Sequence, residues 1–162
     1  MSTLDPRPTL PSRVLGMAAF IVAAVVAAAS GALSSLDAAE QYGTLVQPTW
    51  APPPWLFGPV WTVLYVLIAI AGWRTWEREA AMPMKLWWVQ LALNFSWSPA
   101  FFAAHRIGIA LLIVLLLLGT IGAFIALSWR QDRLTAWLFV PYAAWVAFAS
   151  VLNAAIYWLN SA

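Results

Sequence analysis

The sequence contains no cysteine, a single histidine and few charged residues. Without cysteine, disulfide bonds, thiol catalysis and sulfur-ligated metals are excluded. With His105 alone, a site that needs several imidazoles is excluded as well. Only 9% of the 162 residues are charged and 64% are apolar, whereas soluble domains carry about 25% charged residues. Such a chain cannot cover its apolar surface in water, so the composition predicts that lipid is its solvent.

Five stretches are long enough to cross a bilayer, which takes roughly 20 apolar residues. Their approximate limits are 14–36, 55–76, 84–103, 107–129 and 134–159. The first, of about 23 residues, exceeds the roughly 7–15 of a signal-peptide core, which favours a true span over a cleaved leader. We predict an all-α membrane protein: a short disordered lead at residues 1–13, then a single five-helix transmembrane domain over residues 14–162.

The connection between the first two predicted spans, roughly residues 37–54, is the only one long enough to hold structure of its own. It contains Pro48, Trp50 and three successive prolines at 52–54. Proline runs stiffen a chain towards polyproline geometry. We therefore expect this loop, rich in proline and tryptophan, to be a structured lid rather than a flexible tether.

Basic residues flank the predicted spans unequally. Arg106 alone lies on one side of the predicted membrane, and seven lie on the other: Arg7, Arg13, Arg74, Arg78, Lys85, Arg130 and Arg133. Cytoplasmic segments carry an excess of lysine and arginine. The asymmetry predicts a cytoplasmic N-terminus, with the first loop and the C-terminus outside.

The predicted spans have no charge near their centres, so an ion-driven transporter, a proton relay or an interior lysine Schiff base is not expected. Three spans instead carry polar and aromatic side chains at helical spacing, which places each set on one face. These sets are Trp61 and Tyr65; Gln90, Asn94, Trp97 and Phe101; and Pro141, Trp145, Ala149 and Leu152, with Asn153 beside them.

Such faces have two interpretations. Amide side chains often tie transmembrane helices together, and large aromatic side chains often fill bundle cores. The three stripes together favour a wide, flat pocket lined by indoles, which suits a planar apolar ligand. In that pocket Asn94 is the strong hydrogen-bonding group, and we expect it to orient a ligand carbonyl or carboxyl.

Two rows of small residues predict close helix approach. Ala23, Ala27 and Gly31 form one row in the first span, and Gly119 with Ala123 forms another in the fourth. The sequence leaves open whether the rows pack within one bundle or between two protomers.

Three segments resemble the translocator proteins, also called tryptophan-rich sensory proteins or peripheral-type benzodiazepine receptors. Residues 48–65 read PTWAPPPWLFGPVWTVLY, residues 90–102 read QLALNFSWSPAFF, and residues 141–153 read PYAAWVAFASVLN. They are similar to the family patterns KP-x-W-x-PP-x-W … W-x-x-LY, QL-x-LN-x-x-W-x-P-x-FF and PY-x-x-W-x-x-FA-x-x-LN. Gln47 stands where a lysine is common in the family.

The resemblance implies a five-helix bundle, usually a homodimer, with a ligand cavity under the first loop, here in a bacterial cell membrane. The implied ligands are protoporphyrin IX and haem, isoquinoline carboxamides and benzodiazepines, with no cofactor, no metal and no nucleic acid required. Carried over by position, the ligand-binding residues are Pro52, Trp61, Tyr65, Asn94, Trp97, Trp145, Ala149 and Leu152. A sterol is less expected, because Tyr157 has no basic residue after it, unlike the C-terminal motif of animal members.

Three functions remain open. The first is a sensor or carrier that binds tetrapyrroles. The second is an enzyme that degrades bound porphyrin in light, with Trp61 and Trp145 as the catalytic residues that the resemblance implies. The third is a membrane scaffold whose aromatic faces are only core packing. The sequence offers no general base, nucleophile or metal site, so an enzyme would depend on the excited ligand and oxygen.

Overall fold

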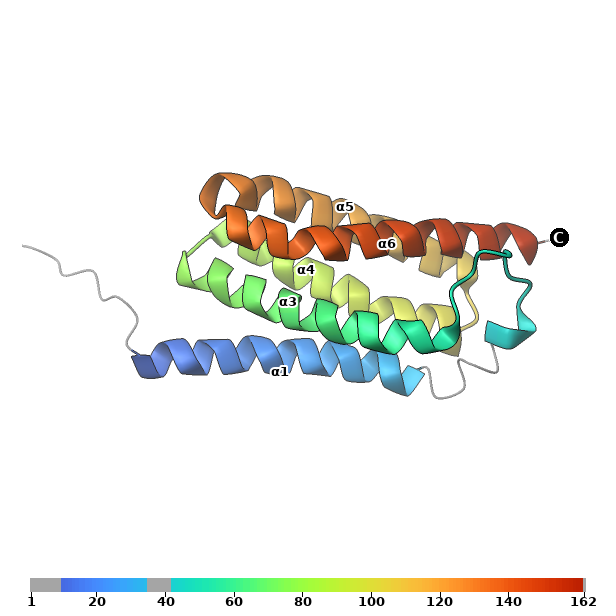
Figure 1. Ribbon diagram of the computed structural model, residues 1–162, viewed down its shortest axis with the longest axis horizontal. Coiled ribbons are helices and arrows are strands. Elements are labelled where there is room, and N and C mark those ends of the chain that lie inside the picture. The colour runs from blue at the N-terminus through green and yellow to red at the C-terminus, as the bar shows by residue number, and fades with distance from the viewer. Residues whose placement is uncertain (1–9, 35–41, 162) are drawn as a thin grey trace, which may run out of the picture.

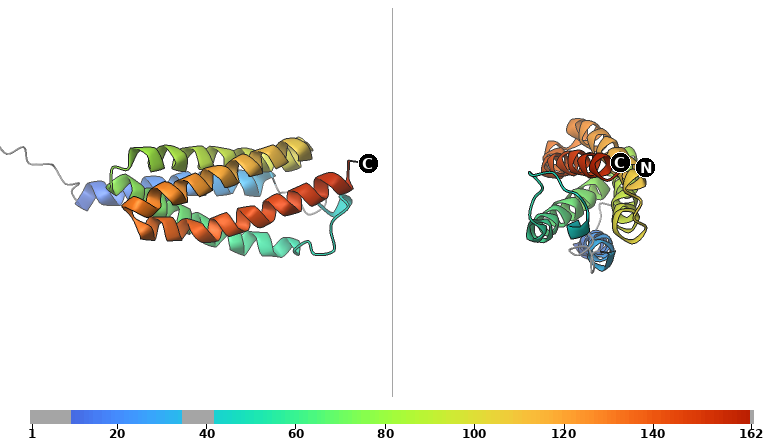
Figure 2. Two further views of the ribbon diagram at one scale, coloured as in Figure 1. Left: turned by 90° about the horizontal axis from the view of Figure 1, so that it is seen from above. Right: turned by 90° about the vertical axis from the view of Figure 1, so that its right-hand side faces the viewer.

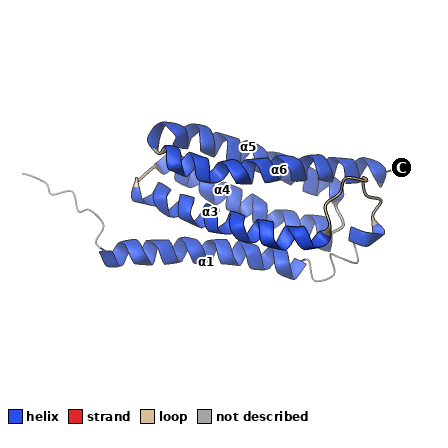
Figure 3. Cartoon of the chain, viewed as in Figure 1, coloured by secondary structure: helices blue, strands red, loops and turns tan. Residues whose placement is uncertain are grey.

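The computed structural model describes residues 10–34 and 42–161, and side chains within them from Ser12 to Ala29 and from Tyr42 onward. Every regular element in these ranges is helical (Figure 3). The long helices are α1 (Leu10–Ser34), α3 (Phe57–Glu77), α4 (Ala81–Ser98), α5 (Ile107–Gln131) and α6 (Arg133–Leu159). A 3₁₀ turn, Pro54–Leu56, leads into α3, and a π-helix, Pro99–Ala103, continues α4. Residues 1–9 of the predicted lead and residues 35–41 of the first connection lie outside this description.

Four of the described helices are long and apolar enough to cross a membrane: α1, α3 with its preceding 3₁₀ turn, α5 and α6. The predicted third span, 84–103, lies within α4 and the π-helix. Among the described helices, α4 is of more mixed polarity, because it carries Lys85 at its start and Gln90 and Asn94 along its length. Both amides are buried in the bundle.

The long helices form one bundle, with their axes roughly along its length (Figure 1). Seen from the end in Figure 2, they surround a common centre. In this ring α1 packs against α3 and α4, α5 packs against α4 and α6, and α3 packs against α6. The two rows of small residues differ in burial. Ala27 of the first row is buried in the core, whereas Gly119 and Ala123 of the second are exposed on α5.

One half of the bundle is closely packed around Trp87 of α4. Its side chain is completely buried, and its indole N–H donates to the carbonyl oxygen of Ile68 in α3 at 2.9 Å. Gly72 makes room for this ring, since a Cβ placed there would lie 2.5 Å from Trp87 Cε2. Phe20 of α1 meets the same indole edge-on, at 5.0 Å between ring centres. Three helices therefore meet at one side chain.

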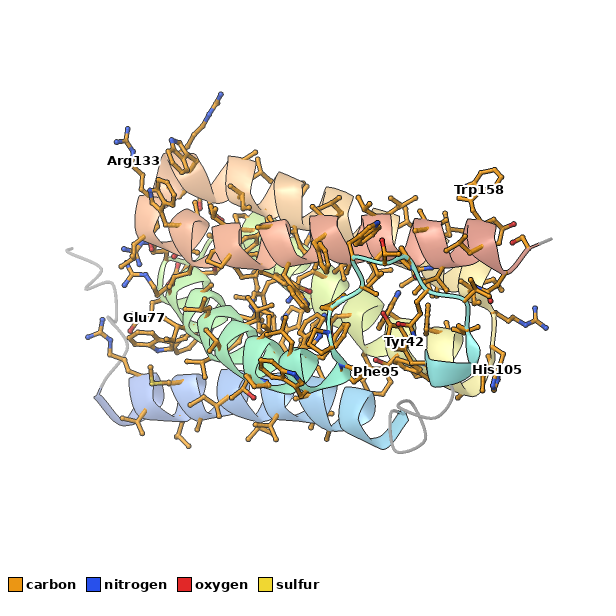
Figure 4. The ribbon with its side chains drawn as sticks, turned by 45° about the vertical axis from the view of Figure 1, so that its right-hand side comes forward. Tyr42, Glu77, Phe95, His105, Arg133 and Trp158 are labelled. Atoms are coloured by element: carbon orange, nitrogen blue, oxygen red, sulfur yellow. The ribbon has the colours of Figure 1, made fainter. Side chains whose placement is uncertain are left out.

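Ion pairs join the helix ends beyond Trp87. Asp132 occupies the whole connection between α5 and α6, caps α6 by accepting from the Leu134 N–H, and binds Arg74 at 2.9 Å and Arg78 at 3.2 Å. Arg13 of α1 pairs with Glu77 of α3 at 2.6 Å. We call this region the ion-paired end. Figure 4 shows Glu77 and Arg133 here, and Tyr42, His105 and Trp158 at the opposite, loop end.

The environment of Asp132 favours its charged form. Burial, the largest single influence, raises the pKa of this carboxyl, but it is outweighed by the hydrogen bonds from Arg74 and Thr135 and by the charges of Arg74 and Arg78. The net result lowers the pKa of Asp132 to about 2. Asp132 is therefore ionised at neutral pH and holds the ends of α3, α5 and α6 together.

Candidate functional site

A cavity of about 920 Å³ lies between the helices and extends from the loop end of the bundle as far as Met17 of α1 and Ile70 of α3. Ligand sites in proteins are commonly about 300–1,000 Å³, so this one can hold a large organic molecule. Side chains from all five long helices, the π-helix and the first loop line it, and none of these described lining residues is charged. The cavity is therefore an apolar site with a few neutral polar groups.

Aromatic side chains form much of the cavity wall. Trp61 lies over Tyr65 in α3, with ring centres 5.4 Å apart, and also meets Tyr142 of α6 at 6.1 Å. Phe57 at the start of α3 meets Trp145 of α6 edge-on at 5.7 Å. The ring contacts between α3 and α6 fix these side chains in place and leave flat faces beside the empty volume.

The π-helix supplies two adjacent aromatic residues to the cavity. Pro99 lacks the N–H that a continuing α-helix would use, and the chain widens to π-helical pairing there. Both Phe101 and Phe102 then line the cavity, although neighbours on a regular helix diverge by about 100°. Trp97 stacks on Phe101 at 5.1 Å, and its N–H donates to Asn153 Oδ1 at 3.1 Å. π-helical turns often occur at functional sites.

One wall carries a continuous chain of hydrogen bonds. The Tyr65 hydroxyl donates to Asn94 Oδ1 at 2.7 Å, and Asn94 Nδ2 donates to the Tyr142 hydroxyl at 3.0 Å. Tyr142 in turn donates to Gln90 Oε1 at 3.0 Å. Asn94 thus ties α3, α4 and α6 together, which is the helix-tie interpretation of such amides. It also lines the cavity and keeps one N–H and one lone pair unused.

The first loop is fastened over the cavity end of the bundle by its backbone. The side-chain amide of Asn160, just past α6, accepts from the Val46 N–H and donates to the Val46 carbonyl, each at 3.0 Å. Trp50 of the loop meets Phe148 of α6 at 5.9 Å. Tyr42 of the loop lines the cavity, and burial raises the pKa of its hydroxyl.

The seam between α1 and α3 forms a thin side wall. Both antiparallel helices supply lining residues along it: Met17, Ile21, Val25 and Ala28 from α1, and Gly58, Thr62, Val66 and Ile70 from α3. Three of them are largely uncovered by other described residues, with exposed fractions of 48% for Ile21, 59% for Val25 and 55% for Val66. The described residues therefore provide no second layer of side chains at this seam.

The structure brings together seven of the eight site residues predicted from the sequence. Trp61, Tyr65, Asn94, Trp97, Trp145, Ala149 and Leu152 all line the cavity. Pro52, the eighth, does not; of the three successive prolines only Pro54 lines it. Sequence reasoning did not single out Tyr142, although its place one turn before Trp145 and its need for a buried hydroxyl partner were signals. The α1 residues carried no signal, because an apolar face towards a cavity looks like one towards lipid.

No group of three His, Cys, Asp or Glu side chains that could hold a metal ion occurs in the described ranges. The indole N–H of Trp145 is buried without a hydrogen-bond partner among the described residues. The chemistry available at the cavity is therefore stacking on flat rings, a few neutral hydrogen bonds and the redox character of indoles.

Residues 18–159 match the TspO/MBR family. The chain belongs to that family. It is 38% identical to Protein CrtK of Rhodobacter capsulatus over 148 aligned residues. The aligned part makes up 88% of this chain and 91% of that relative. Over 119 residues it is 40% identical to the Translocator protein of Ovis aries, covering 69% of this chain and 70% of that one. The Tryptophan-rich sensory protein of Cereibacter sphaeroides is 35% identical over 135 residues, 83% of this chain and 84% of the relative.

Membership of the TspO/MBR family, together with the long apolar helices, makes the chain an integral membrane protein. The family match spans every helix that lines the cavity, from Ala18 of α1 to the end of α6. For this TspO/MBR member the cavity is the candidate functional site.

Proposed function

We propose that the chain binds porphyrins such as protoporphyrin IX and haem in its cavity and acts as a sensor or carrier of tetrapyrroles. The observation that supports this most is a cavity of about 920 Å³ whose uncharged wall includes indole, phenol and phenyl rings beside aliphatic side chains. Flat rings favour flat ligands, because offset stacking and edge-to-face contacts add to the burial of apolar area. Isoquinoline carboxamides and benzodiazepines are flat apolar molecules of the same kind, and we include them among the ligands.

Family membership supports the proposal through the names that two relatives carry, a translocator and a tryptophan-rich sensory protein. Moving or sensing a molecule requires that it be bound. A cavity that lacks charged residues selects a ligand whose body is apolar. The propionate groups of a porphyrin would then lie at the loop end of the cavity, near the water.

The proposed arrangement in the membrane is five spans with a cytoplasmic ion-paired end. Helix α4 lies alongside the four more apolar helices and turns Gln90 and Asn94 inward. Six of the seven basic residues counted on one side, all but Arg7, belong to helix ends at the ion-paired end. A reporter fused after Ala162 should therefore be active outside the cytoplasm, and a cytoplasmic signal would overturn the orientation.

We also propose a homodimer. The exposed positions Gly119 and Ala123 on α5 leave room for the close approach of a second copy. Cross-linking of the protein in native membranes should give a band of twice the monomer mass. A monomer at every cross-linker concentration would exclude the dimer.

Titration with protoporphyrin IX tests the main proposal. In detergent or nanodiscs, tryptophan fluorescence should be quenched to saturation at one ligand per chain. Ala149→Trp should abolish saturable binding because it fills the cavity. Ala19→Trp is the matched control, since it adds an indole at an exposed position of α1 that does not line the cavity and should leave binding unchanged. Equal, unsaturated quenching in all three proteins would show that porphyrin only partitions into the lipid or detergent.

The same complex tests the photochemical alternative, which is favoured by one observation: Trp61 and Trp145 both line the cavity. With light and oxygen, bound protoporphyrin should then be lost faster than free protoporphyrin. Trp61→Phe and Trp145→Phe keep an aromatic side chain but remove the oxidisable indole. They should therefore preserve porphyrin binding in the dark and stop the loss of porphyrin in light. Bleaching at the rate of free porphyrin in every protein would leave binding as the function.

A further inference from the structure

The hydrogen-bond chain in the cavity wall has a direction. Tyr65 donates to Asn94, Asn94 donates to Tyr142, and Tyr142 donates to Gln90. Each donor therefore points from the cavity towards the core. Tyr65 and Asn94 line the cavity, whereas Tyr142 and Gln90 are fully buried and do not. In this direction the Tyr65 hydroxyl has used its hydrogen and offers the cavity only acceptor lone pairs.

The hydrogen-bond chain is incomplete at its buried end, at Gln90. Gln90 Nε2 is buried and has no hydrogen-bond partner among the described residues. Buried amide N–H groups are rarely left unpaired, because losing water without gaining a partner is costly. In the described direction, the Tyr65 hydroxyl at the cavity end has a partner for its hydrogen, whereas the Gln90 NH₂ group in the core has none.

The opposite direction uses the same four side chains in the same places. An amide turned by 180° exchanges its oxygen and its NH₂ group with almost no change of shape. With both amides turned, Gln90 Nε2 donates to Tyr142, Tyr142 donates to Asn94, and Asn94 donates to Tyr65. Three hydrogen bonds are kept. The Gln90 NH₂ group gains a partner and the Gln90 carbonyl oxygen loses one, so the two directions leave the same number of buried polar atoms unpaired. The Tyr65 hydroxyl hydrogen is then free to point at a molecule in the cavity.

We propose that these four side chains form a reversible hydrogen-bond relay that lets the cavity offer either a donor or an acceptor at Tyr65. A ligand carbonyl or carboxylate selects the reversed direction, and a ligand N–H selects the described one. Tyr142 and Gln90 are positioning residues, because they act on the ligand only through Asn94 and Tyr65. The inference rests on the proposed function, that the cavity binds flat apolar ligands.

Three tricyclic molecules of nearly the same shape test the relay. 9-Fluorenone carries one carbonyl, carbazole one N–H, and fluorene neither. Wild-type protein should bind fluorenone and carbazole each roughly threefold to tenfold more tightly than fluorene, the usual effect of one neutral hydrogen bond. Tyr65→Phe should remove both preferences and keep fluorene binding, because it deletes only the hydroxyl.

Gln90→Met separates the two directions. Tyr142 then has only Asn94 to donate to, which fixes the relay in the reversed direction. The fluorenone preference should stay within about twofold of wild type, while the carbazole preference falls to about one. Tyr142→Phe cuts the relay and frees the Asn94 amide to turn, so both preferences should remain. Gln90→Met changing all three affinities by the same factor would show that Gln90 only supports the fold, and would overturn the relay.

An infrared measurement on wild-type protein applies even where a variant fails to fold. The carbonyl band of fluorenone bound to wild type should lie at lower frequency than that of fluorenone in cyclohexane, because Tyr65 donates to it. A band at the cyclohexane frequency would overturn the reversed direction. If neither the tricyclic ligands nor protoporphyrin IX binds saturably to folded wild type, the proposed function itself fails. Saturable binding of all three tricyclic ligands at equal affinity would instead remove the relay alone.

Discussion

The two halves of the bundle use tryptophan in opposite ways. At the ion-paired end, Trp87 fills the space that Gly72 leaves, and the carbonyl of Ile68 satisfies its N–H. At the loop end, Trp61 and Trp145 lie around an empty volume. Between helices in lipid there is no hydrophobic driving force, so close packing and polar contacts hold them together. One half therefore supplies the stability that allows the other half to stay open.

The largest expected difference between the halves concerns loss of a whole indole. Trp87→Ala should lower the free energy of unfolding by about 3–5 kcal/mol, the usual range for a fully buried tryptophan. Trp61→Ala should cost less than half of that, because its ring already borders empty space. Thermal unfolding of the purified proteins in one detergent measures both. Equal losses would mean that the cavity half also carries the stability.

Asp132 supplies the next largest effect. Its pKa of about 2 in the folded protein lies below the roughly 3.9 of an unfolded chain. The stabilisation, roughly 2–3 kcal/mol, is therefore complete above about pH 5 and is lost as the pH falls from about 4 to about 2. Asp132→Asn keeps the cap of α6 but removes the charge, and should cost about 2–3 kcal/mol at pH 7.

Unfolding followed from pH 7 to pH 2 measures this contribution. The difference in stability between wild type and Asp132→Asn should shrink towards zero at the acid end. Glu79→Gln is the control, since Glu79 is an exposed acid in the short connection between α3 and α4. A difference that stays constant with pH would show that the carboxylate charge does not hold this end together.

The smallest effect comes from a single methyl group. Gly72→Ala should cost about 1–3 kcal/mol, because the new Cβ would meet the rigid Trp87 ring. Gly122→Ala is the matched control in α5, where a Cβ meets nothing within 4 Å. Its stability should be unchanged or raised by up to about 1 kcal/mol. Similar melting temperatures for the two variants would contradict the close approach of α3 and α4.

The helices themselves were predictable because each contains a long apolar run. The structure begins the first helix at Leu10 and ends the last at Leu159, within a few residues of the predicted 14 and 159. Trp61, Asn94 and Trp145 were predictable as neighbours because helical spacing and the motifs of the resemblance indicated the same faces. Their roles as ligand-binding residues stay predictions.

Other contacts depend on positions that no local pattern connects. Asn160 holds Val46 across 114 residues of sequence, and nothing near either residue indicates the other. The fit of Trp87 against Gly72 depends on the angle between two helices. The link from Asn94 to Gln90 runs through Tyr142 of another helix, so the spacing within α4 alone could not show it.

The thin seam between α1 and α3 changes what binding means for this cavity. Ile21 and Val66 line it, and about half of each residue is left uncovered by other described residues. Lipid chains surround a membrane protein on the outside of such a wall. An apolar ligand that leaves the cavity through this wall therefore enters lipid rather than water. Transfer of its apolar surface from lipid back into the cavity yields little free energy. Ring shape and the polar atoms at Tyr65 must then decide which ligands are held. Measured affinities will depend on how much bilayer is present, because the lipid competes for the same molecule.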